Sequence, residues 1–439
     1  MSIDGAAASA STRQFLLEKE SELRVEVGSE APLRVRLAAG SAEVFGAELP
    51  PEKWMTVPPL QNVAIFTWRG ATIVLDGTSE VEYVADETPM VSYVNVHAIL
   101  DARRVSANSN SSQFWPTNYF IFQGPRTIVV GPADSGKTSL CRLLLNWACR
   151  RSWKPTFVDL DIGQGSISIP GCIAASSVET PMDSFGGIPT EMPVVYFYGH
   201  TSASANAELY KVLMKELAQT LERRFSCFSE YEAAGMVINT MGWVDGLGYE
   251  LLLQAINLFN ANVVLVLGQE KLFSMLRDVL KSKPHIDIVK LHKSGGVVHR
   301  DQNVHQNCRS YRIREYYHGI KNNLSPYSFS MNFGEINVYR IGDGPQAPPS
   351  ALPIGAEPAS DPTRVVVVNI MPDLIHAILA ISFAKEPDQI MSSNIAGFLF
   401  VSEIDFDSKR ITFLSPCPGE LPSKLLISGS LKWSENPKF

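Results

Sequence analysis

The hydrophobic pattern changes character twice along the chain. Residues 15–98 consist of short segments in which apolar and polar positions alternate between glycines and prolines, the pattern of half-buried strands. Residues 126–322 alternate short continuous apolar runs with longer amphipathic stretches, which predicts strand–helix–strand units. Residues 323–439 contain shorter segments of both kinds. We therefore predict an α/β chain with an N-terminal β-sandwich, a central, mainly parallel sheet with helices on both faces, and a small C-terminal α/β domain.

Two further segments complete the predicted domain plan. Residues 1–14 lack a basic stretch followed by an apolar one, so we interpret them as a disordered tail and not as a signal peptide. Residues 99–125 contain a polar run at 106–112 and are interpreted as a linker, with a helix at about 95–104 leading into it. Nothing in the C-terminal domain looks catalytic, and it fits a partner-binding scaffold as well as an ordinary packed core.

The same periodicity places the elements of the central domain. Strands are expected at 127–130, 156–159, 193–197, 235–239, 263–267 and 286–291. Helices are expected at 137–151, 206–225, 248–258 and 270–280. Ligands of such sheets bind at the carboxyl ends of the strands, so polar residues directly after these strands are the candidates for a site.

The strongest chemical signal is the motif G-x-x-x-x-G-K-T at 131–138, between the first of these strands and the first helix. Its glycines let the backbone curl so that N–H groups point at phosphate oxygens, and the helix N-terminus adds its dipole. This predicts a P-loop NTPase domain, whereas a glycine turn without a ligand is the alternative. Lys137 is expected to hold phosphates and Thr138 to hold Mg²⁺. The expected nucleotide contacts are Gly131, Asp134, Ser135, Gly136, Lys137, Thr138 and Ser139.

Polar side chains follow two other predicted strands. Asp159 and Asp161 end the second strand, where an aspartate can bind Mg²⁺ through water or accept a proton from an attacking hydroxyl. A capping or turn role is the alternative, and Asp161 is the better catalytic candidate. Trp243 follows another strand beside Gly242, where its ring can stack a base or fill the core. The arginine-rich segment 293–314 begins with a glycine pair and forms either a mobile lid over phosphates or an ordinary solvated helix.

Composition limits the remaining possibilities. The net charge of −7 argues against a generally basic nucleic-acid binder, although a local basic groove is compatible with it. The six cysteines show no C-x-x-C spacing, which argues against a zinc site and a disulfide framework and indicates a reducing compartment. No apolar run approaches the ~20 residues of a membrane span. An Asn-Lys-x-Asp guanine reader and H-E-x-x-H spacing are both absent from the sequence, which disfavours a GTPase and a catalytic transition metal.

Taken in order, the segments at 131–139, 159–171, 239–243 and 293–297 resemble the eukaryotic polynucleotide 5′-hydroxyl kinase family of the pre-mRNA 3′-end cleavage factor. The resemblance continues at 22–24, 43–46, 88–90 and 421–424, so it covers nearly the whole chain. It implies transfer of the γ-phosphate of ATP, with Mg²⁺, to the 5′-hydroxyl of RNA. It also implies a nuclear protein of mRNA 3′-end formation and tRNA splicing complexes that binds a scaffold subunit of the cleavage factor.

The resemblance also assigns roles to individual residues. It implies catalytic roles for Lys137, Asp161, Arg300 and Arg309, the last two as arginines of the lid. It implies that Thr138, Asp159 and Gln164 contact the metal and that Trp243 stacks on a base. The RNA clasp corresponds to His200, Thr201 and Ser202. The N-terminal domain is implied to contact the nucleotide through Glu22 and through position 62, which is Asn62.

Three positions depart from the pattern of active members of that family. His305 stands where the lid has another arginine, Asn62 stands where a basic residue is usual, and Ala203 replaces the proline of the clasp. Lid arginines contribute roughly 10³–10⁵ in rate, so catalysis should be weakened more than binding. The leading hypothesis is a polynucleotide kinase. The alternatives are a nucleotide-loaded scaffold subunit with weak or absent activity, and a generic ATPase, which would leave Trp243 and the clasp unexplained.

Overall fold

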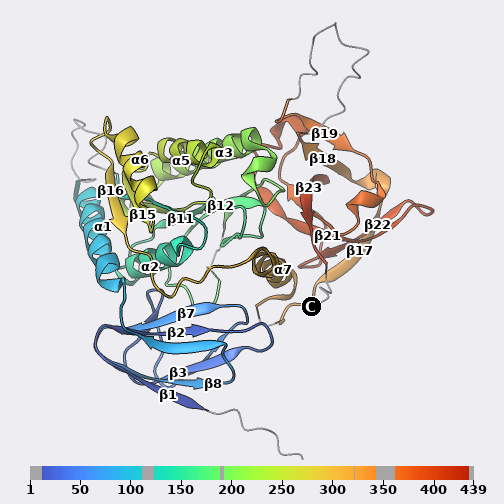
Figure 1. Cartoon of the computed structure of the whole chain (residues 1–439). Helices are drawn as coiled ribbons and strands as arrows, with labels where there is room; N and C mark the ends of the chain where they lie inside the picture. Colours follow the sequence, from blue (N-terminus) through green and yellow to red (C-terminus); the bar gives the residue numbers. More distant parts are fainter. Residues whose placement is uncertain (1–11, 111–122, 188–191, 321, 343–360, 435–439) are drawn as a thin grey trace, which may run out of the picture.

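The computed structural model describes residues 12–110, 123–187, 192–320, 322–342 and 361–434. An N-terminal pair of sheets, a central sheet between helices and a C-terminal sheet follow one another along the chain (Figure 1). Helix α7 (Gln302–His318) lies in the middle of the molecule, near all three parts (Figure 1). The predicted lid therefore sits where the three domains meet.

The N-terminal domain is a β-sandwich, as predicted. One sheet has the order β1-β8-β3-β6 and the other β5-β4-β7-β2-β9, and both bury their apolar faces in one core. The strands are β1 (Arg13–Leu17), β2 (Ser21–Glu26), β3 (Leu33–Gly40), β4 (Glu43–Val44), β5 (Ala47–Glu48), β6 (Trp54–Val57), β7 (Asn62–Thr67), β8 (Ala71–Asp76) and β9 (Val81–Ala85). Since β1 pairs with β8 from Arg13 onward, the expected tail over 1–14 is too long at its end, and residues 1–11 lie outside the described residues.

The predicted linker over 99–125 is wrong for residues 99–110, because they belong to helix α1 (Met90–Asn110). Leu100 and Arg104 are fully buried, and the guanidinium Nε of Arg104 donates to the carbonyl oxygen of Ala234 at 2.9 Å. The serine- and asparagine-rich end of this segment has a weak helix propensity, but packing against α2 and α4 overrides it. The rest of the predicted linker is described only from residue 123, because 111–122 lie outside the described residues.

The central sheet has the order β13-β12-β11-β14-β10-β15-β16, and β12 alone of these strands runs antiparallel to its neighbours. Helices α3, α5 and α6 pack on the face of Ile128 and Val130, while α1 and α2 pack on the face of Val129. The strands are β10 (Arg126–Val130), β11 (Thr156–Asp159), β12 (Cys172–Ser177), β13 (Val194–Phe197), β14 (Met236–Asn239), β15 (Val263–Leu267) and β16 (Asp287–Leu291). The remaining helices are α2 (Lys137–Arg150), α3 (Ala207–Cys227), α4 (Ser229–Ala234), α5 (Leu247–Leu258) and α6 (Glu270–Leu280).

The C-terminal domain is not the α/β unit that the sequence predicts. Its described residues form one sheet, β17-β22-β21-β20-β23-β18-β19, with short 3-10 turns and no α-helix. The apolar run at 374–384 is strand β20, buried on both faces, and such a run cannot be told from a helix by periodicity. The strands are β17 (Tyr327–Asn332), β18 (Asn337–Ile341), β19 (Val365–Val368), β20 (Ala377–Ser382), β21 (Ile395–Asp405), β22 (Arg410–Ser415) and β23 (Leu425–Lys432).

Of the helices in the described part of the chain, none has the length and apolar character needed to span a bilayer.

Candidate active site

The loop between β10 and α2 has the curled geometry of a phosphate-binding loop. Gly136 adopts the left-handed φ of 90° directly before the first residue of α2, which favours glycine. Lys137 is 6% exposed, and its ammonium donates to the carbonyl oxygen of Pro132 at 2.8 Å. Burial lowers the pKa of Lys137, and the nearby charge of Asp161 opposes that effect. A bound phosphate would favour the charged amine and offer it a better partner than a carbonyl.

Asp159, Asn239 and Thr138 form a buried polar network beneath this loop. Asp159 accepts hydrogen bonds from the Asn239 amide at 3.0 Å, the backbone N–H of Asp161 at 3.1 Å and that of Ser166 at 2.6 Å. The Asn239 amide also donates to the Thr138 hydroxyl oxygen at 3.4 Å, while its own oxygen is buried without a partner. The network fixes Thr138 beneath the loop and leaves one oxygen that needs a donor or a cation.

Asp161 is the carboxylate whose charge most strongly favours the charged form of Lys137. Its Oδ1 accepts the backbone N–H of Gly163 at 2.9 Å, which orients the carboxylate. Burial raises the pKa of Asp161 to about 6, the charge of Asp159 adds to the increase, and Lys137 opposes it. A pKa near the working pH suits a general base.

The segment predicted to form the lid contacts the phosphate loop through Asp134. This residue has a φ of 51°, and its side chain is 8% exposed. Its carboxylate accepts the backbone N–H of Arg300 at 3.0 Å and lies 3.2 Å from His299 Nδ1 and 3.6 Å from His305 Nε2. His305 Nδ1 is in turn 3.0 Å from the Gln164 amide nitrogen. His305 therefore links the phosphate loop to the loop after Asp161.

One cavity of about 280 Å³ collects most of the predicted site residues. The phosphate loop forms one wall, and the lid residues Arg300, His305 and Arg309 form another. Of the predicted residues, Asn62, Asp134, Ser135, Gly136, Lys137, Thr138, Asp161, Gln164, Arg300 and Arg309 line it. Asp159 lies beneath it, within the network described above. Gly131 and Ser139 belong to the same loop and helix but are not part of its lining.

Glu22 stands apart from that cavity. It is 3% exposed, and its carboxylate accepts bonds from Arg24 at 2.6 Å and from the Thr88 hydroxyl at 2.8 Å. Arg24 lies directly beneath the lid's glycine pair, since a β-carbon on Gly295 or Gly296 would come within 2.8 Å of its side chain. The nucleotide contact of Glu22 stays a prediction; in the structure its carboxylate holds Arg24, which packs against the glycine pair.

Trp243 and the clasp flank the cavity on the side of Asp161. Trp243 is 36% exposed, and its ring packs on the start of α5, where a β-carbon on Gly248 would overlap it at 2.4 Å. The clasp residues Thr201 and Ser202 are exposed, and His200 Nδ1 is 2.7 Å from the Ser430 hydroxyl of β23. A β-carbon on Gly163 would lie 3.7 Å from the Thr201 carbonyl oxygen, so the clasp borders the Asp161 loop. Their contacts with RNA remain predictions.

The oxygen groups beneath the loop fit Mg²⁺. The hydroxyl of Thr138, the carboxylate of Asp159 and the unpartnered oxygen of Asn239 are the hard ligands that this cation prefers, directly or through water. The described residues contain no cluster of three or more His, Cys, Asp or Glu side chains that could hold a metal by themselves.

Comparison with known proteins identifies the family. Three family models match consecutive parts of the chain: "N-terminal beta-sandwich domain of polyadenylation factor" over 16–107, "mRNA cleavage and polyadenylation factor CLP1 P-loop" over 131–319, and "Pre-mRNA cleavage complex II protein Clp1" over 324–435. A "Protein CLP1 homolog" of Arabidopsis thaliana is 58% identical over 429 residues, covering 98% of this chain and 96% of the relative. The chain belongs to the Clp1 family.

Other relatives extend this finding. A "Polyribonucleotide 5'-hydroxyl-kinase Clp1" of Gallus gallus is 38% identical, with 99% of this chain and 100% of the relative covered. A solved structure of a Clp1p–Pcf11p complex superposes with a TM-score of 0.82 at 24% identity, covering 97% of this chain and 99% of that one. The predicted resemblance, the N-terminal β-sandwich and the central P-loop domain are thus confirmed for this Clp1-family chain.

Two residues of the site were missed as functional candidates. Asn239 lay within a segment that the sequence singled out, but nothing marked its amide as the link between Asp159 and Thr138. Arg312 of α7 donates to the carbonyl oxygens of Gly165 at 3.2 Å and Ser166 at 2.6 Å. The arginines of this segment are numerous, so only the folded structure distinguishes the one that grips the neighbouring loop.

Proposed function

We propose that this chain is an ATP-dependent polynucleotide 5′-hydroxyl kinase that transfers the γ-phosphate of ATP to the 5′-hydroxyl of RNA. The observation that carries the proposal is the placement of Asp161 and Lys137 in one cavity beneath the arginines of the lid. A buried carboxylate with a raised pKa beside a phosphate-binding lysine suits activation of a hydroxyl for phosphoryl transfer. The name of the Gallus gallus relative supports the same reaction.

In the proposed reaction Asp161 accepts the proton of the 5′-hydroxyl as its oxygen attacks the γ-phosphorus, and ADP leaves. Lys137 holds the β- and γ-phosphates, and Arg300 and Arg309 stabilise the charge that develops on the transferred group. Thr138, Asp159 and Gln164 would hold Mg²⁺, which supplies charge neutralisation on the phosphates when it is bound. Trp243 and the clasp hold the first nucleotide of the acceptor RNA. Asn62 and Glu22 contact ATP from the side of the N-terminal domain.

The cellular setting follows from the family. We propose that the chain acts in the nucleus, in mRNA 3′-end cleavage and polyadenylation, and that it also serves in tRNA splicing. A scaffold subunit of the cleavage factor is the expected protein partner, and the solved complex of Clp1p with Pcf11p supports a partner of that kind. RNA with a 5′-hydroxyl end is the expected nucleic-acid partner.

His305 favours a second candidate, a nucleotide-loaded scaffold subunit with little kinase activity. Its two ring nitrogens contact Gln164 and Asp134, so its side chain ties the lid to the phosphate loop. Unlike an arginine, it does not present a permanent positive charge to the phosphates. A lid arginine at this position would add such a charge. The two candidates share the fold and nucleotide binding and differ only in turnover.

The deciding experiment is transfer of labelled γ-phosphate from ATP to single-stranded RNA with a 5′-hydroxyl, using the full chain. Transfer that is lost in both Lys137→Ala and Asp161→Asn would support the kinase. Tight ATP binding without transfer would support the scaffold. The variant His305→Arg should raise turnover, and an unchanged rate would show that the departure in the lid has no catalytic cost.

A further inference from the structure

A second cavity adjoins the phosphate-loop cavity. It has a volume of about 210 Å³ and shares Thr138, Gln164, Arg300 and Arg309 with the phosphate-loop cavity. The loop residues 133–137 do not line it, and neither do Asp161 and Gly163. Its lining therefore differs from that of the phosphate-loop cavity in lacking the loop and Asp161, while Arg300 and Arg309 face both cavities.

The lining of this cavity is strongly cationic. Four guanidinium groups, those of Arg142, Arg300, Arg309 and Arg312, meet a single carboxylate, that of Glu315. Glu315 is already paired with Arg312 at 2.5 Å. The guanidinium groups of Arg300 and Arg309 have no hydrogen bond or ion pair to another described residue. The charge of the cavity is thus largely uncompensated within the described part of the chain.

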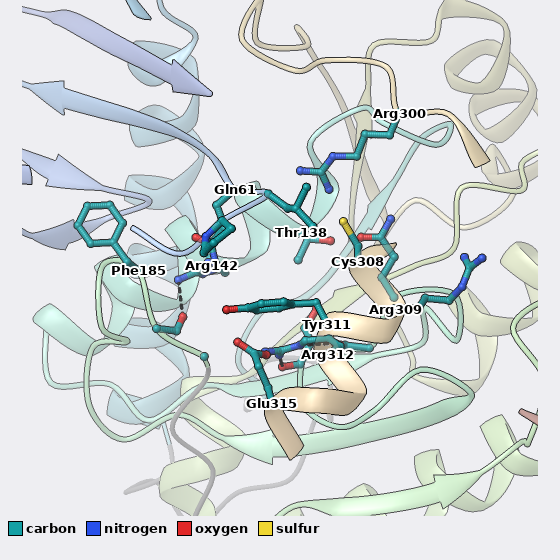
Figure 2. A pocket seen from close by; sticks show the side chains of 17 residues that line it. Gln61, Thr138, Arg142, Phe185, Arg300, Cys308, Arg309, Tyr311, Arg312 and Glu315 are labelled. Carbon is teal, nitrogen blue, oxygen red and sulfur yellow. Dashed lines mark hydrogen bonds and ion pairs between the residues drawn. The ribbon is translucent and has the colours of Figure 1, made fainter. Parts of the chain in front are cut away.

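Arg142 contributes a buried side-chain nitrogen without a partner to this cavity. It reaches into the cavity from α2, opposite Tyr311 and Arg312 of α7 (Figure 2). One Nη donates to the carbonyl oxygens of Gly186 at 3.1 Å and Asp183 at 3.3 Å, but its Nε is buried without a hydrogen-bond partner. Burial lowers the pKa of Arg142 to about 10, and the charge of Arg312 adds to the decrease. An oxyanion in the cavity would supply the missing acceptor and separate the two like charges.

We propose that this second cavity is a binding site for a phosphate-type oxyanion, held between Arg142 of α2 and the arginines of α7. Its guanidinium groups present the forked N–H donors that bind a phosphate through paired, charge-assisted hydrogen bonds. The phosphate is either free or the terminal group of a nucleic-acid strand. Because the anion contacts both α2 and α7, its binding stabilises the docked lid. The proposal does not depend on kinase activity.

Cys308 provides a reporter for occupancy, because it lines this cavity and is partly exposed. The experiment measures its alkylation rate by peptide-resolved mass spectrometry in the full chain carrying Lys137→Ala, which removes the main contact of the phosphate loop. Inorganic phosphate is the probe. At a concentration ten times the dissociation constant, alkylation of Cys308 should slow about tenfold, as follows from simple occupancy. Alkylation of the exposed Cys227 should not change.

The variant Arg142→Gln, made in the same background, should abolish the protection of Cys308. Since Arg142 also holds the loop at Asp183 and Gly186, Arg309→Gln serves as a second variant that leaves α2 intact, and it should weaken protection several-fold. A 5′-phosphorylated dinucleotide that protects at lower concentration than inorganic phosphate would assign the terminal phosphate of a strand, and the reverse order would assign the free anion. No protection in the Lys137→Ala protein, or protection unaffected by both arginine variants, would overturn the proposal.

Discussion

Replacing Arg312 tests whether the lid helix positions the catalytic loop. Its Nε and one Nη donate to the carbonyl oxygens of Gly165 and Ser166, and the N–H of Ser166 donates to Asp159. The guanidinium therefore ties α7 to the loop that carries Gln164 and, one hydrogen bond further, to Asp159. The variant Arg312→Gln removes the charge and the fork that makes both bonds.

The size of the effect follows from these two hydrogen bonds. A hydrogen bond from a charged donor contributes about 1.5–3 kcal/mol. The Arg312 side chain is 30% exposed, so water can replace part of the lost hydrogen bonding, and we use the lower value. Two bonds then give about 3 kcal/mol, which changes the docking equilibrium of the lid about 100-fold. A misplacement of about 1 Å at a reacting group also costs about 100-fold in rate. We expect kcat to fall between tenfold and 100-fold.

Steady-state phosphoryl transfer to a 5′-hydroxyl RNA, together with equilibrium ATP binding, separates this role from a loss of nucleotide affinity. The phosphate loop is untouched in Arg312→Gln, so the dissociation constant of ATP should change less than threefold, a difference below about 1 kcal/mol. Arg314→Gln is the matched control, since Arg314 lies exposed on the same helix. Equal kcat values in the two variants, or a loss of ATP affinity as large as the loss of kcat, would refute the reasoning.

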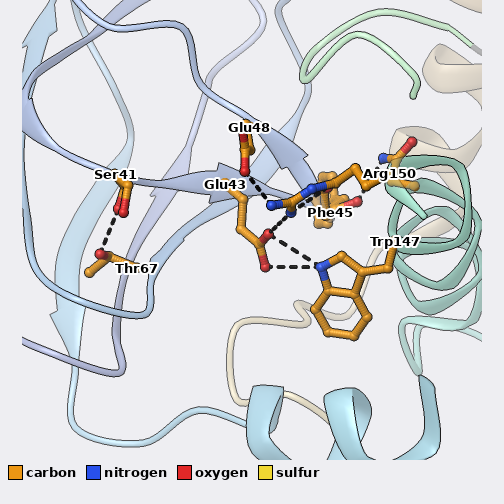
Figure 3. Close-up of polar contacts among 9 residues, drawn as sticks. Ser41, Glu43, Phe45, Glu48, Thr67, Trp147 and Arg150 are labelled. Carbon is orange, nitrogen blue, oxygen red and sulfur yellow. Dashed lines mark hydrogen bonds and ion pairs between the residues drawn. The ribbon is translucent and has the colours of Figure 1, made fainter. Parts of the chain in front are cut away.

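Three further predictions concern Asp161, the domain interface and Gly242. Because Asp161 must be ionised to accept a proton and its pKa is about 6, the transfer rate should fall about tenfold per pH unit below pH 6. If the residual activity of Asp161→Asn shows the same fall at acidic pH, Asp161 is not the base. Glu43 accepts hydrogen bonds from Arg150 at 2.6 Å and from the Trp147 indole at 3.2 Å (Figure 3). In denaturant titrations, Glu43→Gln should therefore lower the free energy of unfolding by about 2 kcal/mol. The control Glu48→Gln, at an exposed position, should lower it by less than about 0.5 kcal/mol. A β-carbon on Gly242 would lie 2.4 Å from the Ala133 backbone nitrogen, so Gly242→Ala should weaken ATP binding at least tenfold by calorimetry, while Gly334→Ala, with open space around it, should bind normally.

The sequence predicted most of the central domain because its elements carry local signals. The strands around the phosphate loop are short apolar runs bounded by turn residues, and the six that were expected all occur. Strand β12 was missed, since its residues Cys172–Ser177 are small and lack the β-branched and aromatic side chains typical of strands, apart from Ile173. Its place is fixed by pairing with β11 and β13, which no local pattern encodes.

In the candidate site, too, the sequence predicted the local geometry but not the contacts between distant residues. The motif at 131–138 predicted its own geometry, because two glycines and a helix start are local requirements. The contacts that complete the site join residues far apart in the chain. Gln164 meets His305, 141 positions away, and His200 meets Ser430, 230 positions away. Such pairings depend on how the domains pack, which a single sequence does not display.

The contacts of the lid with both outer domains indicate that all three domains together set its position. Arg24, held by Glu22 of the N-terminal sandwich, supports the glycine pair at the start of the lid. At the other end, the hydroxyl oxygen of Tyr316 in α7 accepts the backbone N–H of Phe398 in β21 at 3.0 Å. The lid is therefore fastened at its beginning to one outer domain and at its far end to the other. Between these anchors, Asp134 of the phosphate loop and the bonds of Arg312 to Gly165 and Ser166 determine its position. A partner that shifts either outer domain would change the geometry of the lid without touching the catalytic residues.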